Sequence, residues 1–157
     1  MPEDPRYDVD TRELPQALRE VFTQFEQDEA LTAFLADCNA HPHTWLDMAL
    51  LFGLSQITET YNAHGILGLY PMHLLSTPQW EALVPIELYG GRLLDIGAGQ
   101  GFVTEYARPL FSEITAIETA SSMVRRLHAR GFRAHQADIT TEPNLFPHES
   151  FDVVSIL

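Results

Sequence analysis

Three glycines at every second position, Gly97, Gly99 and Gly101, follow an apolar stretch over 91–96 and are the clearest chemical signal in this chain. Glycine lets a strand turn sharply with positive φ values, and a backbone without Cβ atoms can touch a bulky ligand. A helix is expected to open directly after the turn, so its unpaired N–H groups and positive dipole end favour a polar or anionic ligand. The pattern therefore predicts a nucleotide-type site.

The spacing of these glycines argues against a dinucleotide cofactor. A dinucleotide-binding turn has the pattern Gly-x-Gly-x-x-Gly, which would place its third glycine where Phe102 stands. Here Asp95 precedes the turn in the pattern Asp-x-Gly-x-Gly-x-Gly. A glycine-rich turn alone is weakly specific, so the elements around it have to support the interpretation.

Two acidic residues follow predicted strands further along the chain. The alternating stretch 113–117 ends in Glu118, and the stretch 132–137 is followed by Asp138. A carboxylate at the end of the second strand is placed to accept two hydrogen bonds from ribose hydroxyls, although a surface acid at a strand end is the alternative.

Residues 91–157 resemble motifs I to IV of the class I S-adenosylmethionine-dependent methyltransferases. The resemblance implies a Rossmann-like α/β fold, with strands 1–4 of a mostly parallel sheet, an N-terminal helical extension and S-adenosyl-L-methionine as cofactor. It also implies that the glycine turn passes beneath the methionine and ribose moieties, that Asp95 helps to hold the turn and that Asp138 reaches the adenine amino group. The cofactor-binding residues implied are Asp95, Gly97, Ala98, Gly99, Gly101, Glu118, Thr119, Met123, Asp138 and Ile139. We expect the turn and the carboxylates of Glu118 and Asp138 to converge on one cavity shaped for an adenosyl group.

The stretch 63–80, before the glycine turn, carries a second resemblance. It combines two glycines and a Tyr-Pro pair with many apolar side chains, which is typical of a loop that covers a site. In the protein-histidine N1-methyltransferases of the DREV type (methyltransferase-like protein nine), a similar segment reads roughly Asn-Gly-Phe-Leu-Gly-Arg-Gly-Ser-Met before Ser-Pro-x-Gln. The residues that match at the same spacing are Gly65, Leu67, Gly68, Met72, Ser76 and Gln79. His64 replaces the asparagine, and residues 69–71 replace Arg-Gly-Ser.

This second resemblance implies methyl transfer to a ring nitrogen of histidine in His-x-His-type protein motifs. The substrate-side loop would contain His64, Gly65, Gly68, Tyr70 and Met72. The attacking ring nitrogen must be neutral, and a hydrogen bond must orient the other nitrogen. Nothing before Leu157 clearly provides that bond, so we assign no catalytic residue. A small-molecule methyltransferase and a non-catalytic cofactor-binding module stay open as alternatives.

The charge balance limits the classes of molecule that we expect this protein to bind. The chain has 22 acidic and 9 basic residues and a formal net charge of −13 at pH 7. Such an acidic surface repels phosphate backbones and accommodates cationic or histidine-rich substrates more easily. We therefore expect a histidine-rich protein or peptide as substrate and no nucleic-acid partner.

Cysteine usage and hydropathy predict a protein of the cytoplasm. The single cysteine, Cys38, excludes an internal disulfide and a cysteine-based zinc site, and we expect it to pack in the core. No metal site is suggested by the spacing of the histidines. The N-terminus has no secretory signal, and the longest apolar run, 48–52, is far too short to cross a bilayer. We expect a soluble chain with no membrane partner.

The domain organisation predicted from these patterns has three parts. They are a mobile arm over 1–12, a helical region with the substrate-side loop over 13–88 and an incomplete Rossmann-like half domain over 89–157. Within the second part we expect helices over 13–27, 29–37, 44–61 and 77–83. An apolar strand with an unpaired edge is adhesive, so we expect a chain that stops on the strand 151–157 to be a truncated portion of a longer protein.

Overall fold

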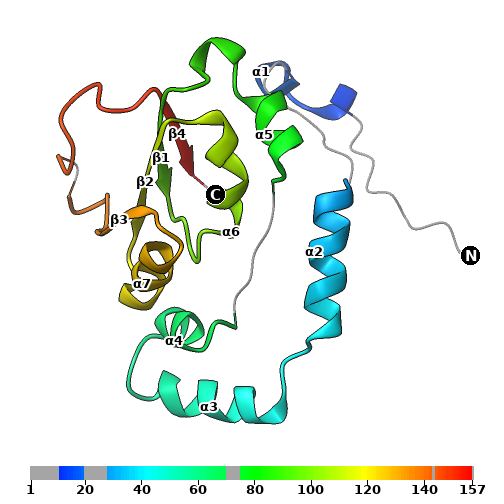
Figure 1. Ribbon diagram of the computed structural model, residues 1–157, viewed down its shortest axis with the longest axis vertical. Coiled ribbons are helices and arrows are strands. Elements are labelled where there is room, and N and C mark those ends of the chain that lie inside the picture. Colours follow the sequence, from blue (N-terminus) through cyan, green and yellow to red (C-terminus); the bar gives the residue numbers. More distant parts are fainter. Residues whose placement is uncertain (1–10, 20–27, 70–74, 143, 157) are drawn as a thin grey trace, which may run out of the picture.

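The computed structural model describes residues 11–19, 28–69, 75–142 and 144–156, and its centre is a parallel four-stranded sheet (Figure 1). The strands are β1 (Arg92–Ile96), β2 (Glu113–Glu118), β3 (Arg133–Gln136) and β4 (Val153–Ile156). They lie in the order β3-β2-β1-β4, and all three neighbouring pairs are parallel. The predicted Rossmann-like α/β class and its four strands are confirmed. Because the chain steps outward from β1 to β3 and then returns to the other side of β1, the glycine turn after β1 lies at a topological switch point.

Alternation along β1 produces two separate cores. Leu93 packs with Trp80 of α5 (Thr77–Leu83) and Val103 of α6 (Phe102–Ala107) on one face of the sheet. Leu94 packs with Ile117 on the other face, against the partly buried side chains of Leu145, Phe146 and Phe151. Successive strand residues point to opposite faces, so a single apolar run serves both cores. A further helix, α7 (Ser121–Ala129), packs through Leu127 against β2.

The N-terminal part of the chain is helical, as predicted, but its boundaries differ. Its elements are η1 (Thr11–Glu13), α1 (Gln16–Arg19), α2 (Glu29–Ala40), α3 (Trp45–Ser55), α4 (Thr60–Leu67), α5 and η2 (Ile86–Leu88). Residues 1–10, in the predicted mobile arm, and 20–27, in the predicted helix 13–27, lie outside the described residues. Thr44 caps α3, with a capping box to Asp47.

The prediction of one helix over 44–61 is wrong. α3 ends at Ser55, and the amides of Ile57 and Thr58 both bond back to the carbonyl of Leu54 in a tight turn. α4 then starts in a new direction and packs on α7 (Figure 1). Tertiary packing of α4 thus overrides a helical periodicity that continues across the turn.

The loop predicted over 63–80 is also wrong in its first part. His64 and Gly65 belong to α4, and Gly68 ends this helix in the left-handed conformation with φ 73°. The predicted helix over 77–83 is confirmed, and Ser76 is its N-cap. Tyr70 and Met72 lie outside the described residues.

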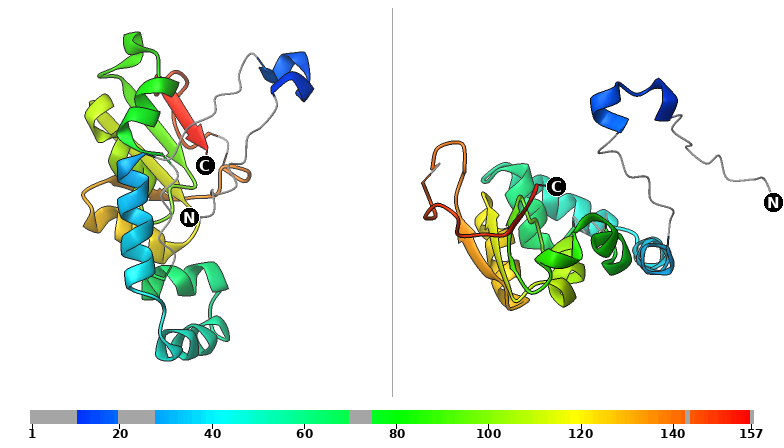
Figure 2. Two further views of the ribbon diagram at one scale, coloured as in Figure 1. Left: turned by 90° about the vertical axis from the view of Figure 1, so that its right-hand side faces the viewer. Right: turned by 90° about the horizontal axis from the view of Figure 1, so that it is seen from above.

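Apolar side chains of α3 are largely exposed. Trp45 keeps 81% of its surface exposed and Phe52 keeps 71%. Figures 1 and 2 show α3 set apart from the sheet, with α4 between them. Cys38 of α2 is half-buried rather than packed in the core. No helix in the described part of the chain combines the length and the apolar character needed to cross a membrane.

Candidate cofactor site

The glycine turn has the backbone conformation that its sequence predicts. Gly97, Gly99 and Gly101 have φ values of 76°, 55° and 80°. A Cβ on Gly101 would come within 2.8 Å of Leu127, so this glycine permits close packing of the turn on α7. A Cβ on Gly99 would meet only the Tyr61 hydroxyl, at 3.7 Å. Gly99 is therefore the position where the missing side chain leaves room for a ligand.

Glu118, at the end of β2, reaches this turn with its carboxylate. Only 3% of Glu118 is exposed. Its Oε2 accepts hydrogen bonds from the Gly99 amide at 2.9 Å and from the Tyr61 hydroxyl at 3.0 Å. Its Oε1 accepts from the Thr119 amide at 2.7 Å, the Thr119 hydroxyl at 3.2 Å and the Ala120 amide at 3.3 Å. A bare backbone turn and a buried acceptor thus meet, which fits the ribose and methionine portions of the implied cofactor.

Asp95 is buried beneath the turn, with 1% exposure, and links three elements. Its Oδ2 accepts from the Thr104 hydroxyl of α6 at 2.5 Å, and its Oδ1 accepts from the Ser155 hydroxyl of β4 at 2.8 Å. Burial raises the pKa of Asp95; the two hydroxyl bonds oppose this shift and the charge of Glu118 adds to it. Asp95 therefore ties β1 to α6 through Thr104 and to β4 through Ser155. The sequence analysis missed both hydroxyl residues; the signal for Ser155 was a hydroxyl within an otherwise apolar strand.

Asp138 does not join this cluster through its described contacts. Its Oδ1 accepts from the amide and hydroxyl of Thr140, at 2.9 and 2.7 Å, and these bonds lower the pKa of Asp138. The carboxylate is exposed and closes its own turn, two residues beyond the end of β3. Ile139 is 36% exposed beside it. The structure thus joins the glycine turn to Glu118 by a direct hydrogen bond, whereas the described contacts of the carboxylate of Asp138, which follows the strand paired with β2, are to Thr140.

The remaining predicted cofactor residues differ in accessibility. Thr119 is exposed, and Ala98 is half-buried against the cluster that contains Leu127. Met123 has no exposed surface, and its Sδ lies 3.0 Å from where a Cβ on Gly65 would stand. Met123 therefore packs between α7 and α4.

Two polar contacts fasten α4 to the first turn of α7. The Asn62 side chain accepts a hydrogen bond from the Ser122 amide at 3.0 Å, and the Ser122 hydroxyl donates to the Asn62 carbonyl at 2.8 Å. A Cβ on Gly65 would stand 2.1 Å from the Ser122 hydroxyl, so only glycine fits this crossing without a shift. Asn62 was missed in the sequence, where its only signal was a polar amide within a helical pattern.

Arg126 fastens the other end of α4. Its guanidinium donates to the carbonyls of Gly65 and Ile66, the latter at 3.1 Å. It also lies 2.6 Å from where a Cβ on Gly68 would stand. Cations at a helix C-terminus interact favourably with its carbonyls and dipole. α4 is thus anchored at both ends, beside the glycine turn.

The predicted substrate-side residues that the structure describes belong to this anchoring. His64 contacts the carbonyl of Thr60 through Nδ1 at 2.7 Å, within α4. Gly65 allows the helix crossing, and Gly68 ends the helix. Further along the matched segment, Ser76 and Gln79 form the capping box of α5. Four of the matching residues that the structure describes therefore shape the end of α4, its crossing with α7 or the start of α5: Gly65, Gly68, Ser76 and Gln79.

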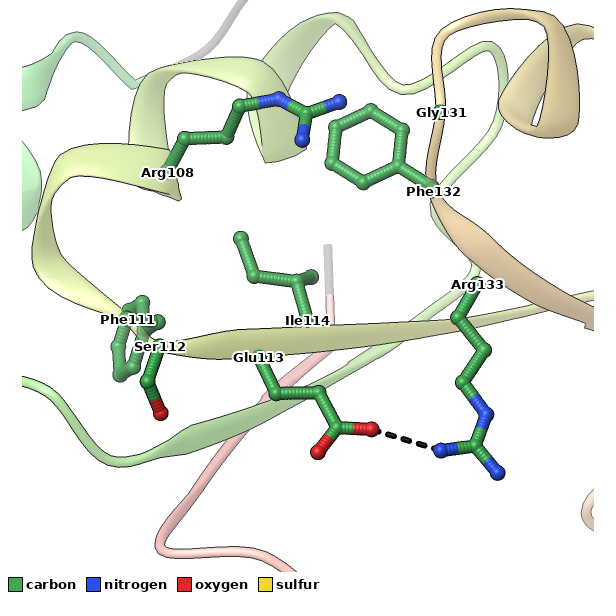
Figure 3. A pocket seen from close by; sticks show the side chains of 8 residues that line it. All are labelled: Arg108, Phe111, Ser112, Glu113, Ile114, Gly131, Phe132 and Arg133. Carbon is green, nitrogen blue, oxygen red and sulfur yellow. Dashed lines mark hydrogen bonds and ion pairs between the residues drawn. The ribbon is translucent and has the colours of Figure 1, made fainter.

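A cavity of about 420 Å³ lies at the opposite edge of the sheet (Figure 3). It is lined by Arg108, Phe111, Ser112, Glu113, Ile114, Gly131, Phe132 and Arg133. Arg108 stacks 3.9 Å from the Phe132 ring centroid, and Arg133 pairs with Glu113 at 2.7 Å. These residues precede or begin β2 and β3, whereas the glycine turn follows β1. This cavity is distinct from the one predicted for an adenosyl group. Within the described ranges, no three His, Cys, Asp or Glu side chains are grouped so as to hold a metal ion.

Comparison with known proteins places the chain in a family. A curated relative, the ubiquinone biosynthesis O-methyltransferase of Xanthomonas euvesicatoria, is 37% identical over 62 residues, which are 38% of this chain and 26% of that protein. A solved S-adenosylmethionine-dependent methyltransferase from Mesorhizobium loti is 26% identical over 50% of this chain and 37% of its own, with a TM-score of 0.42. One from Clostridium acetobutylicum is 25% identical over 49% and 32%, with a TM-score of 0.40.

The matched segments are partial, and the chain spans about a quarter of the length of the curated relative. The likeness to the solved structures is weak at these TM-scores, so the family assignment comes from a match to a sequence model of a protein family. The family model for DREV methyltransferases matches residues 7–157. The chain belongs to the DREV methyltransferase family, and its cofactor is S-adenosyl-L-methionine.

Proposed function

We propose that this chain carries the cofactor site of a methyltransferase that acts on a ring nitrogen of histidine in His-x-His-type protein motifs. The single observation that carries the proposal is the hydrogen bond from the Gly99 amide to Glu118. It sets an open stretch of backbone beside a buried carboxylate. The bound cofactor would supply the methyl group as an electrophile. Gly99 would let the ligand lie against the turn, and Glu118 would accept hydrogen bonds from the ribose hydroxyls.

The charge of the chain supports a histidine substrate. Methyl transfer is an in-line displacement, so the site must align the nucleophile and exclude water. A neutral imidazole that attacks the methyl group becomes cationic until it loses the proton on its other nitrogen. The net charge of −13 favours a cationic ring in and around the site. The resemblance of residues 63–80 to the histidine-methylating family supports membership in that family. Gly65, Gly68, Ser76 and Gln79 in this segment shape helices, so the substrate class needs the separate test given below.

A small-molecule methyltransferase is the second candidate. The observation that favours it is the match to a ubiquinone biosynthesis O-methyltransferase over 62 residues. A non-catalytic module that binds the cofactor is the third. The three candidates share the cofactor site and differ in what receives the methyl group.

Binding of S-adenosylhomocysteine tests the shared site. Gly99→Arg places a side chain where the turn is open, and we expect it to weaken binding by roughly 100-fold or more, because it occupies the ligand's space. Gly90→Arg is the matched control, since Gly90 also has a positive φ, of 78°, and a Cβ added there would meet no atom within 4 Å. Titration calorimetry of both variants and the unmodified chain gives the comparison. Equal affinity for all three would remove the proposed site.

A labelling experiment separates the three candidates. The protein is incubated with methyl-labelled cofactor and either a His-x-His peptide, the same peptide with Asn-x-Asn, or a catechol. Label in the histidine peptide alone supports the first candidate, and label in the catechol supports the second. Cofactor binding without transfer to any acceptor supports the non-catalytic module.

A further inference from the structure

Tyr61 enters the cofactor site from α4, and it stands 57 residues earlier in the chain than Glu118. Its hydroxyl donates to Glu118 Oε2 at 3.0 Å and lies 3.7 Å from where a Cβ on Gly99 would stand. The hydroxyl thus lies over the open part of the turn and on the carboxylate at once. We propose that Tyr61 occupies the place of a ribose hydroxyl on Glu118 and so sets the cofactor affinity, an inference that rests on the cofactor role proposed for Glu118.

The hydrogen bonds already made by Glu118 leave no room for an additional donor. An ionised carboxylate offers about four acceptor positions. Glu118 already accepts from the Gly99 amide, the Tyr61 hydroxyl, both groups of Thr119 and the Ala120 amide. A ribose hydroxyl can therefore bind Glu118 only by displacing one of these donors.

Among these donors, Tyr61 is the one that a ligand on the turn meets. The amides belong to the turn and to the backbone after β2, so moving them would disrupt the fold locally. The Thr119 hydroxyl bonds Oε1, whereas Tyr61 shares Oε2 with Gly99. Tyr61 is 37% exposed, so part of its side chain faces solvent.

The anchoring of α4 keeps this exchange local. Asn62, the next residue, is bonded to Ser122, and Arg126 holds the far end of the helix. The Tyr61 hydroxyl therefore leaves Glu118 by side-chain rotation while the helix stays on α7. Binding then exchanges one hydroxyl donor for another, and the Tyr61 bond is the part of the cofactor-free state that opposes it.

Tyr61→Phe tests the proposal by calorimetric titration with S-adenosylhomocysteine. Removal of the competing hydroxyl is expected to tighten binding by roughly threefold to tenfold, because a hydrogen bond to a charged group no longer has to be broken. Tyr89→Phe is the matched control, since Tyr89 is also 37% exposed and its hydroxyl donates one bond, to the Glu81 carbonyl at 3.3 Å. We expect Tyr89→Phe to bind as the unmodified chain does.

Ligands without one ribose hydroxyl distinguish competition from a general structural effect. The gain from Tyr61→Phe should shrink for 2′-deoxy or 3′-deoxy S-adenosylhomocysteine, as in a double-mutant cycle between residue and ligand. An equal gain for every ligand, unchanged binding, or weaker binding by Tyr61→Phe would each overturn the proposal for Tyr61 and leave the cofactor site intact. Absence of binding by the unmodified chain would overturn the proposed cofactor role of Glu118 itself.

Discussion

The two edges of the sheet treat their carboxylates in opposite ways. At the carboxyl-terminal edge, Asp95 and Glu118 are buried, and their described partners are neutral hydroxyl and amide donors. At the amino-terminal edge, Glu113 pairs with Arg133 at 2.7 Å, and Asp152 pairs with Arg92 at 3.4 Å, with all four side chains partly exposed.

This contrast distinguishes the candidate binding site at the carboxyl-terminal edge from the cavity at the amino-terminal edge. The amino-terminal edge has a cavity of about 420 Å³, but its charges are compensated by ion pairs in contact with water, and such pairs contribute little. At the carboxyl-terminal edge the described partners of the buried carboxyl groups are hydroxyls and amides, and in such a buried setting an exchangeable hydroxyl donor is worth more. The chemistry of the donors therefore identifies the binding edge better than the volume does.

The largest difference between the edges is expected from removing one glutamate at each. Glu118→Gln should weaken S-adenosylhomocysteine binding by about 100-fold, because the hydrogen bonds that ribose and the Gly99 amide donate to a charged acceptor are lost or weakened. Glu113→Gln should leave the affinity unchanged and lower the free energy of unfolding by less than about 1 kcal/mol. Calorimetry and urea unfolding measure the two effects. Similar losses of affinity at both positions would break the comparison.

Hydroxyl partners provide the second contrast. Thr104→Val leaves a buried oxygen of Asp95 without its donor and should lower the free energy of unfolding by about 2 kcal/mol. Ser112→Ala removes an exposed hydroxyl that bonds the Gly91 carbonyl at 3.1 Å, and should cost less than about 0.5 kcal/mol. Urea denaturation midpoints at constant slope give both values. The expected ranking is Thr104 well above Ser112, and the reverse ranking would contradict the account of Asp95.

The helix that carries Tyr61 to the carboxyl-terminal edge can be tested through its glycine. Gly65→Ala forces a methyl group against Ser122 and should destabilise the fold by about 1–2 kcal/mol. The matched change is Gly53→Ala in α3, where nothing lies within 4 Å, and this should stabilise by about 0.5–1 kcal/mol. Thermal unfolding of the two variants would show shifts of opposite sign. Shifts in the same direction would mean that the α4–α7 crossing is not tight.

The smallest effect is a pH dependence of opposite sign at the two edges. Burial raises the pKa of Asp95 above 3.8, so the native state holds this proton more tightly, and its contribution to stability falls as pH rises from about 4 through the folded pKa. The backbone bond from Arg92 lowers the pKa of Asp152, so its contribution is present above 3.8 and is lost as pH falls through the folded pKa. Unfolding of the unmodified chain, Asp95→Asn and Asp152→Asn at several pH values checks both signs.

Local patterns predicted much of this fold. The glycines of the turn, the apolar strands around them, the start of a helix near residue 44 and the helix over 77–83 could be predicted because each depends on a few neighbouring residues. The helix predicted over 44–61 failed because its periodicity continues across a turn that only the packing of α4 on α7 requires. The same packing explains why His64 and Gly65, which we predicted to lie in a loop, belong to α4.

In the candidate site, too, local features could be predicted from the sequence and long-range contacts could not. The sequence by itself determined that a glycine turn follows the first strand and that an acid ends the second, because φ preferences and strand alternation are local properties. Only the tertiary structure decided that Glu118 bonds Gly99 and that Tyr61 lies on the same carboxylate. These contacts join segments that are far apart in the chain. Their outcome depends on how α4, α7 and the sheet pack together, which no short stretch of sequence encodes.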